Sequence, residues 1–183
     1  FRNRAYFDGV IRILTKGSIP YDLADLTIRS ATDLLDYPTL VLVTNEIMDA
    51  DTQKKLVEYV RRGGKLVVFP TLPKYDRDFG PCSLLADALR VRTLGRGSSN
   101  RIYMAGLKDI PVPQLPSVID SRGATVLARD VNGKCVGIEK KLGKGTVRFF
   151  GFFLQYSIQE HPSLWSAMMQ LPEVARNAWA DDD

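Results

Sequence analysis

A strand, a helix and a second strand follow one another between residues 39 and 69. Thr39–Thr44 is an unbroken run of aliphatic and β-branched side chains, which is typical of a parallel strand buried on both faces. Acidic residues around Asp49 then predict the start of a helix, and Gly63-Gly64 predicts its end. Lys65–Phe69 is a second apolar run. The pattern predicts a right-handed βαβ crossover, with three helix residues on the inner side: Leu56, Val57 and Val60.

Helical spacing of apolar residues occurs near both ends of the chain. Residues 5–14 carry apolar side chains three and four positions apart, and Lys16-Gly17 supplies a basic last turn and a glycine cap. A short helix is predicted at Ser83–Leu89 and a last one at Leu164–Leu171. Pro20–Leu26 alternates apolar and polar side chains, and we therefore predict a short strand there.

The second half of the chain has the pattern of β-structure interrupted by turns. Residues 94–123 are rich in glycine and proline and predict a loop-rich excursion with one strand at Arg101–Met104. Asn132-Gly133 is a strong hairpin signal, because both central positions of such a turn need positive φ. Three apolar runs predict a C-terminal antiparallel β-meander: Ala124–Arg129, Cys135–Lys141 and Thr146–Phe152. We therefore predict an α/β fold, a three-layer sandwich with a mainly parallel sheet that continues into this meander.

Composition limits the class of protein. A chain of 183 residues with 45% hydrophobic and 25% charged residues fits a single globular domain and is too short for a complete glycosidase barrel. The net charge of +4 comes from basic pairs, such as Lys54-Lys55 and Arg61-Arg62, that have acidic neighbours, so we predict no nucleic-acid partner. No apolar run approaches about 20 residues, so we predict no membrane partner. Cys82 and Cys135 are interpreted as buried thiols without a disulfide framework or a metal site.

The first residue is Phe1 rather than Met, and no secretory or transit segment is visible. We therefore expect a processed chain or a piece of a longer protein, and the compartment stays open. Gly95-Arg96-Gly97 lacks the third glycine of a dinucleotide fingerprint, and Gly143-Lys144-Gly145 lacks the spacing of a P-loop. No cofactor is therefore predicted.

Candidate ligand contacts follow the two predicted parallel strands. Open α/β sheets bind ligands at the carboxyl ends of their strands. Asn45 and Glu46 come after the first strand, and Thr71, Lys74 and Tyr75 come after the second. The alternative for Asn45 and Glu46 is a polar loop that satisfies backbone groups ahead of the helix.

His161 is the only histidine, so a hydrolytic triad would have to use it. A nucleophile is expected at a strained turn after a strand, flanked by small residues. Pro70-Thr71-Leu72-Pro73 suits a rigid turn better, and Cys82 lies too far beyond it. We therefore predict no catalytic residue, and His161 is kept as a further candidate ligand contact. The alternative is a hydrolase that pairs Thr71 or Cys82 with His161.

Three segments together resemble a known family. Leu40–Asn45 followed by Met48–Asp51 and Leu56–Val67, with Tyr-Val-x-x-Gly-Gly at the helix end, resembles the middle domain of family-42 β-galactosidases. Gly17–Asp22 is similar to the lead into the second strand of that domain, and Gly143–Gly151 is similar to its closing hairpin. The resemblance spans about residues 5–155 and extends to the flavodoxin-like, glutamine-amidotransferase-like superfamily.

This resemblance implies a flavodoxin-like accessory domain, often called the trimerisation domain, attached to a barrel that carries the catalytic carboxylates. No catalytic residue is carried over, because the barrel lies outside this chain. The family domain begins with a central strand before its first helix, so we expect that strand upstream of Phe1. The excursion at 94–123 has no counterpart, and the amidotransferase elbow Gly-x-Cys-x-Gly is absent, with Ser163 in place of Glu after His161-Pro162.

We therefore predict that residues 1–183 form one glutamine-amidotransferase-like domain of a larger, β-galactosidase-like glycoside hydrolase, with a non-catalytic accessory or oligomerisation role. The expected partners are the catalytic barrel, identical subunits, or both, with carbohydrate as a further candidate. Two alternatives stay open: a divergent amidotransferase-like or esterase-like hydrolase, and a sugar- or nucleotide-binding module that uses the strand ends.

Overall fold

The computed structural model describes residues 2–16, 19–153 and 168. Along the chain the elements are α1 (Arg2–Lys16), the 3-10 helix η1 (Asp33–Asp36), β1 (Thr39–Val43), α2 (Ala50–Arg61), β2 (Lys65–Phe69), α3 (Leu84–Leu89), β3 (Thr93–Arg96), β4 (Arg101–Met104), β5 (Leu107–Pro111), β6 (Ser117–Ile119), β7 (Thr125–Asp130), β8 (Cys135–Leu142) and β9 (Gly145–Phe150). The helix predicted at Leu164–Leu171 lies outside the described residues, apart from Met168.

A seven-stranded mixed sheet organises the fold, in the order β1-β2-β9-β8-β7-β4-β5. β1, β2 and β9 run parallel, and every other neighbouring pair runs antiparallel. The sheet is thus less parallel than predicted, because β8, β7, β4 and β5 all join it through antiparallel pairings. β3 and β6 form a separate antiparallel pair. The predicted βαβ unit is confirmed, since β1 and β2 pair in parallel on either side of α2.

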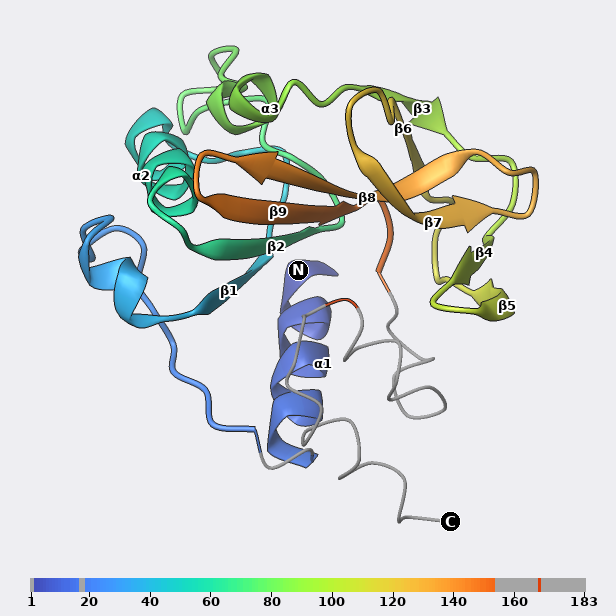
Figure 1. Cartoon of the computed structure of the whole chain (residues 1–183), viewed down its shortest axis with the longest axis horizontal. Helices are drawn as coiled ribbons and strands as arrows, with labels where there is room; N and C mark the ends of the chain where they lie inside the picture. Colours follow the sequence, from blue (N-terminus) through green and yellow to red (C-terminus); the bar gives the residue numbers. More distant parts are fainter. Residues whose placement is uncertain (1, 17–18, 154–167, 169–183) are drawn as a thin grey trace.

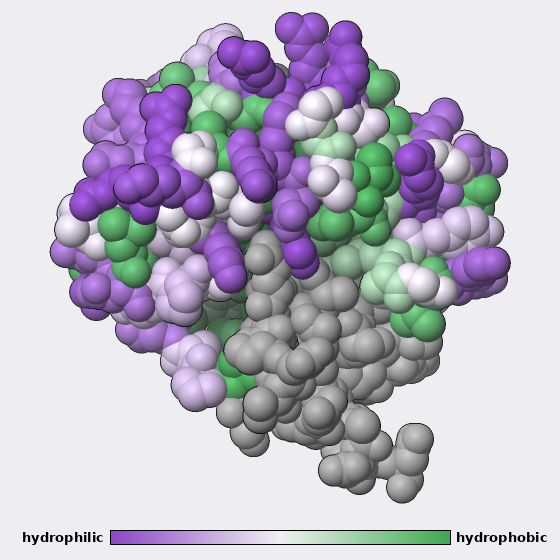
Figure 2. Space-filling view, in the orientation of Figure 1, coloured by the Kyte–Doolittle hydropathy of each residue, from purple (hydrophilic) through white to green (hydrophobic). Residues whose placement is uncertain are grey.

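Helices cover both faces of the sheet (Figure 1). Val10 and Leu14 of α1 pack against one face, in a core that contains Val67 and Phe69. α2 and α3 cover the opposite face, over a second core. The surface over these two helices is largely hydrophilic, with smaller hydrophobic areas between (Figure 2). Among the described helices, none is both long and apolar enough to span a bilayer.

Tyr59 explains the Gly63-Gly64 pair at the end of α2. Gly63 has φ +126, which terminates the helix. At Gly64 a Cβ would come within 2.2 Å of the Tyr59 ring, so only glycine leaves room for this buried ring. The Tyr59 hydroxyl lies 2.9 Å from the carbonyl oxygen of Tyr37 and 3.1 Å from that of Lys65. One side chain therefore joins α2, the approach to β1 and the start of β2.

The strand predicted at Pro20–Leu26 is absent from the structure, where this segment has no ladder partner. Local hydrogen bonds take the place of a ladder: the Asp22 carboxylate accepts from the Leu23 N–H at 2.7 Å, and Asp25 accepts from the Thr27 N–H at 2.8 Å. Short polar side chains that satisfy nearby backbone in this way compete with strand formation. Apolar alternation alone was therefore misleading.

The predicted loop-rich excursion contains more regular structure than expected. Besides the predicted strand β4, residues 94–123 include β5, β6 and most of β3. These strands have only three to five residues and include Pro111 and Gly95, which weaken a strand signal in the sequence. Their formation depends on pairing between distant residues, such as Thr93 with Ile119.

Candidate functional site

The loops after β1 and β2 are joined by hydrogen bonds. The Glu46 carbonyl accepts from the N–H groups of Lys74 and Tyr75, at 2.8 and 2.9 Å, and the Met48 N–H donates to the Tyr75 carbonyl at 2.9 Å. The Lys74 ammonium lies 2.6 Å from the Glu46 carboxylate. The residues expected at the strand ends are thus held side by side.

Buried Gln53 fixes the longer of these two loops. Its Nε2 donates to the carbonyls of Met48 and Cys82, at 2.9 and 3.0 Å, and its Oε1 accepts from the Leu85 N–H at 3.1 Å. A polar side chain that is fully buried requires such partners. Gln53 therefore ties α2 to the loop that precedes it, at Met48, and to the start of α3.

A cavity of about 160 Å³, here called the strand-end cavity, opens at the carboxyl ends of β1, β2 and β9. Asn45, Glu46 and Thr71 line it, so three of the predicted ligand residues come together. Phe152 and Phe153, which follow β9, are almost fully buried in its wall. Tyr75 lies outside the lining and is 39% exposed. His161 lies outside the described residues.

The excursion supplies the remaining wall of the strand-end cavity, through Arg96 and residues 113–115. The Arg96 guanidinium donates to the Leu115 carbonyl at 3.1 Å. The Ser117 N–H donates to the Gly151 carbonyl at 2.7 Å, which fastens the excursion to the end of β9. Sequence reasoning missed Arg96, because nothing local in the sequence indicates that β3 reaches the ends of distant strands.

Asp130 packs against Gly97, the residue that follows Arg96 in the excursion. It is fully buried, and its Oδ1 accepts from the N–H groups of Asn132 and Lys134, at 2.9 and 2.8 Å. Its Oδ2 has no hydrogen-bond partner among the described residues and lies near Gly97, where a Cβ would come within 3.3 Å of it. The Gly97 N–H donates to the Pro116 carbonyl at 2.7 Å. Glycine at position 97 thus lets the excursion close tightly over Asp130.

The polar groups of the cavity are partly engaged already. Asn45 Oδ1 accepts from the Ile47 N–H at 2.8 Å. This bond fits the alternative interpretation of the segment, in which its polar side chains satisfy backbone groups ahead of the helix. The Thr71 hydroxyl lies 3.4 Å from the Leu72 carbonyl, a long and weak contact. Glu46 and Lys74 keep about half of their side chains exposed. Among the described residues that line the cavity, Arg96 and Glu46 carry charge, and Lys74 pairs with Glu46 from outside the lining.

The two thiols differ in their surroundings. Cys82 is half-buried and outside the cavity lining, with its Sγ 3.4 Å from Gln53 Nε2. Cys135 is buried, and burial raises the pKa of its thiol, as expected for an unreactive core cysteine. Within residues 2–16, 19–153 and 168, no group of three or more His, Cys, Asp or Glu side chains is placed to hold a metal ion.

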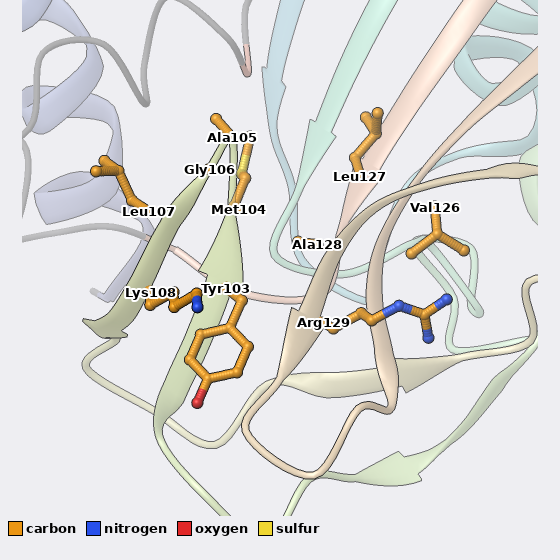
Figure 3. A pocket seen from close by; sticks show the side chains of 10 residues that line it. All are labelled: Tyr103, Met104, Ala105, Gly106, Leu107, Lys108, Val126, Leu127, Ala128 and Arg129. Carbon is orange, nitrogen blue, oxygen red and sulfur yellow. The ribbon is translucent and has the colours of Figure 1, made fainter.

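A second hollow, of about 280 Å³, lies where the β4–β5 hairpin turns away from β7. Figure 3 shows that its side chains diverge: Leu107 and Leu127 point to one side of the sheet, and Tyr103 points away from them. Leu107 and Leu127 pack against the core on the α1 face. We interpret this hollow as a notch at the edge of the sheet, and none of the predicted ligand residues lines it.

These features define a class of protein: an α/β module with a mixed sheet and a small polar cavity at the ends of its parallel strands. The sequence profile of the GLMA-like second-domain family matches residues 1–125. The chain belongs to this family.

Sequence relatives are much longer than this chain. It is 28% identical over 182 residues to a β-1,2-glucosyltransferase of Ignavibacterium album, covering 99% of this chain and 25% of that protein. It is 30% identical over 162 residues to an exo-β-D-glucosaminidase of Pyrococcus horikoshii, covering 84% of this chain and 20% of that protein. The chain thus spans a quarter or less of the length of these relatives.

Solved structures share the fold. The β-galactosidase from Rahnella sp. R3 superposes with a TM-score of 0.71 at 18% identity, over 90% of this chain and 27% of that one. The GH42 β-galactosidase Gan42B from G. stearothermophilus gives 0.72 at 19% identity, over 88% and 25%. The predicted resemblance to family-42 β-galactosidases is confirmed at the level of fold.

Proposed function

We propose that this chain is the non-catalytic accessory domain of a larger carbohydrate-active enzyme. One observation carries the proposal: residues 1–125 match a family defined as a second domain, in relatives of which the chain spans only 25% and 20%. The strand-end cavity agrees with this role, because Glu46, the carboxylate of its described lining, is held in an ion pair with Lys74.

The relatives suggest the substrate class of the complete enzyme. The sequence matches at 28% and 30% identity are a glucosyltransferase and a glucosaminidase, whereas the β-galactosidases resemble this chain at 18% and 19%. At 18% and 19% identity, structural similarity is evidence of a shared fold and not of a shared substrate. The parent enzyme therefore acts on β-linked glucose or glucosamine units, in keeping with the sequence relatives.

The complete domain is a flavodoxin-like sandwich whose first strand lies upstream of Phe1 and pairs with the outer edge of β1. All five residues of β1 are half-buried, and among residues 19–153 no strand pairs with that edge. An apolar parallel edge strand is normally covered.

The expected binding partner is the catalytic domain of the same protein, with identical subunits as a further partner. Extending the chain upstream tests the structural part of this proposal. We expect the amide protons of Thr39–Val43 that face outward to exchange with deuterium at least tenfold more slowly in the longer chain. Unchanged exchange would contradict the added strand.

Activity assays of the purified chain test the functional part. We expect no release of nitrophenol from nitrophenyl β-glucosides, β-glucosaminides or β-galactosides, and no hydrolysis of glutamine or of nitrophenyl esters. Turnover that disappears in Thr71→Ala or Cys82→Ala would instead support the hydrolase alternative and overturn the accessory role.

A further inference from the structure

We propose that the strand-end cavity is a subsite for one neutral pyranose unit. The proposal deepens the accessory role described above, because it gives the domain a direct contact with the saccharide that the larger enzyme handles. A volume of about 160 Å³ lies below the range of about 300–1,000 Å³ of sites for drug-sized ligands, so it suits a single sugar ring.

The polar groups of the cavity come from separate segments and can surround a ring. Asn45 and Glu46 follow β1, Thr71 follows β2, and Arg96 reaches in from the excursion. A carboxylate and a guanidinium can each make two parallel hydrogen bonds, which matches neighbouring hydroxyl groups on a pyranose. Three of these groups are held in place, Glu46 by Lys74, Arg96 by the Leu115 carbonyl and Asn45 by the Ile47 N–H.

Apolar side chains provide a surface for the C–H groups of the sugar. Pro70 and Pro113 line the cavity from two separate segments, the end of β2 and the excursion, and Phe152 and Phe153 are only 2% and 3% exposed. Rings that are already buried lose little conformational freedom when a ligand binds. A mostly apolar lining with a few fixed polar groups is the usual composition of a small-molecule site.

The charges select against an amino sugar. Glu46 is already paired with Lys74, which lies outside the lining, so Arg96 is the remaining charged side chain of the described lining and would repel the ammonium group of a protonated glucosamine unit. A glucose unit carries no charge and escapes this cost. The site should therefore prefer glucosides to glucosaminides.

Titration of the full chain with methyl β-D-glucopyranoside, followed by amide NMR, tests the proposal. We expect saturable shifts at Asn45 and Thr71 in the millimolar range, and at least tenfold weaker binding of methyl β-D-glucosaminide at a pH where its amine is protonated. Arg96→Ala should weaken glucoside binding at least fivefold. Thr71→Val keeps the side-chain shape, removes the hydroxyl and should weaken binding about threefold.

Lys108→Ala is the matched control, because it removes a cation from the same excursion but outside the cavity, and it should leave glucoside binding unchanged. Absence of saturable shifts would overturn the proposal, as would equal binding of the glucosaminide or insensitivity to both cavity variants. Binding of inorganic phosphate or glucuronate without binding of the glucoside would show an anion site instead. Turnover of the glucoside would refute the non-catalytic role. It is measured in a separate assay, so failure of that role is distinguished from failure of glucoside binding.

Discussion

The parallel part of the sheet and the antiparallel region beyond it, which includes the separate β3–β6 pair, are stabilised in different ways. In the parallel part, four of the five residues of β2 are buried, and α2 packs so closely that glycines are needed at its contacts. In the excursion, β3 is exposed along its whole length, and the segment is held by hydrogen bonds such as Ser117 to Gly151 together with separate buried side chains such as Ile119. The strand-end cavity lies between these two parts, so its geometry requires both the close packing and the hydrogen bonds.

Gly145→Ala has the largest expected effect on stability and tests the close packing of α2 against the parallel strands. A Cβ at this position of β9 would come within 2.2 Å of the carbonyl oxygens of both Val60 and Gly64. Backbone atoms cannot yield without separating α2 from the sheet, so Gly145→Ala should lower the free energy of unfolding by about 3 kcal/mol, at the upper end for overpacked cores. Urea denaturation followed by circular dichroism measures this loss.

Gly133, in the turn between the antiparallel strands β7 and β8, is the control. It has φ +78 in an exposed turn with no heavy atom within 4 Å of an added Cβ, so Gly133→Ala adds only backbone strain, worth about 1 kcal/mol. Equal losses at the two glycines would contradict the view that close packing distinguishes the parallel part.

Substitution of Asp130 tests how far hydrogen bonds hold the excursion in place. Asp130→Ala removes the acceptor of the Asn132 and Lys134 N–H groups, and should cost about 2 kcal/mol. Hydrogen exchange should accelerate at Gly97 and Ser117 while the amides of β2 keep their protection relative to global unfolding. Asp130→Asn retains shape and one acceptor oxygen, so it should lose less than half as much. Uniform acceleration across both parts would show that the excursion is not a separate local unit.

The same contrast explains what could be predicted from the sequence. Periodicity predicted β1, α2 and β2, because burial on both faces leaves an unbroken apolar run in each strand. It failed at Pro20–Leu26, where Asp22 and Asp25 satisfy the backbone locally. Asn45, Glu46 and Thr71 were predicted from the rule that ligands bind at strand ends, and in the structure they line one cavity. Arg96 could not be predicted, since its position depends on the pairing of Thr93 with Ile119, which no local signal specifies.

Tyr59→Phe removes a hydroxyl that lies near the carbonyls of Tyr37 and Lys65 and should cost about 1.5 kcal/mol at neutral pH. Burial raises the pKa of Tyr59 from 10.0 to about 12. The folded protein therefore keeps the Tyr59 proton up to a higher pH than the unfolded chain does. The contribution of the neutral hydroxyl to stability is complete below pH 10 and is lost as the pH rises toward 12. The loss amounts to about 2–3 kcal/mol.

Comparison of the two proteins by urea denaturation at a series of alkaline pH values isolates this contribution, because all other titrating groups are shared. The stability advantage of the unmodified chain over the Tyr59→Phe variant should shrink as the pH rises above 10 and then reverse. A difference that stays constant with pH would show that burial of the hydroxyl does not perturb its titration.

Asp49 gives the smallest expected effect and concerns the loop that joins β1 to α2. Its carboxylate caps the helix, with Oδ1 accepting from the Thr52 N–H at 2.8 Å and Oδ2 accepting from the Thr52 hydroxyl at 2.9 Å. Burial opposes ionisation and is the largest single influence, but the Thr52 hydrogen bonds and Arg77 together outweigh it, so the pKa of Asp49 lies below 3.8. Asp49→Ala should cost about 1 kcal/mol at neutral pH.

A group with a lowered pKa stabilises the fold above its unfolded pKa and loses that contribution as the pH falls through its folded value. The difference between the unmodified chain and Asp49→Ala should therefore be constant above about pH 5 and shrink below about pH 4, as measured by urea denaturation. Asp51→Ala is the matched control, because Asp51 is in the same helical turn with 89% of its side chain exposed, and it should cost only a few tenths of a kcal/mol. A similar loss and a similar pH profile for both variants would mean that general helix electrostatics, rather than the cap made by Asp49, fixes the start of α2 beside the strand-end cavity.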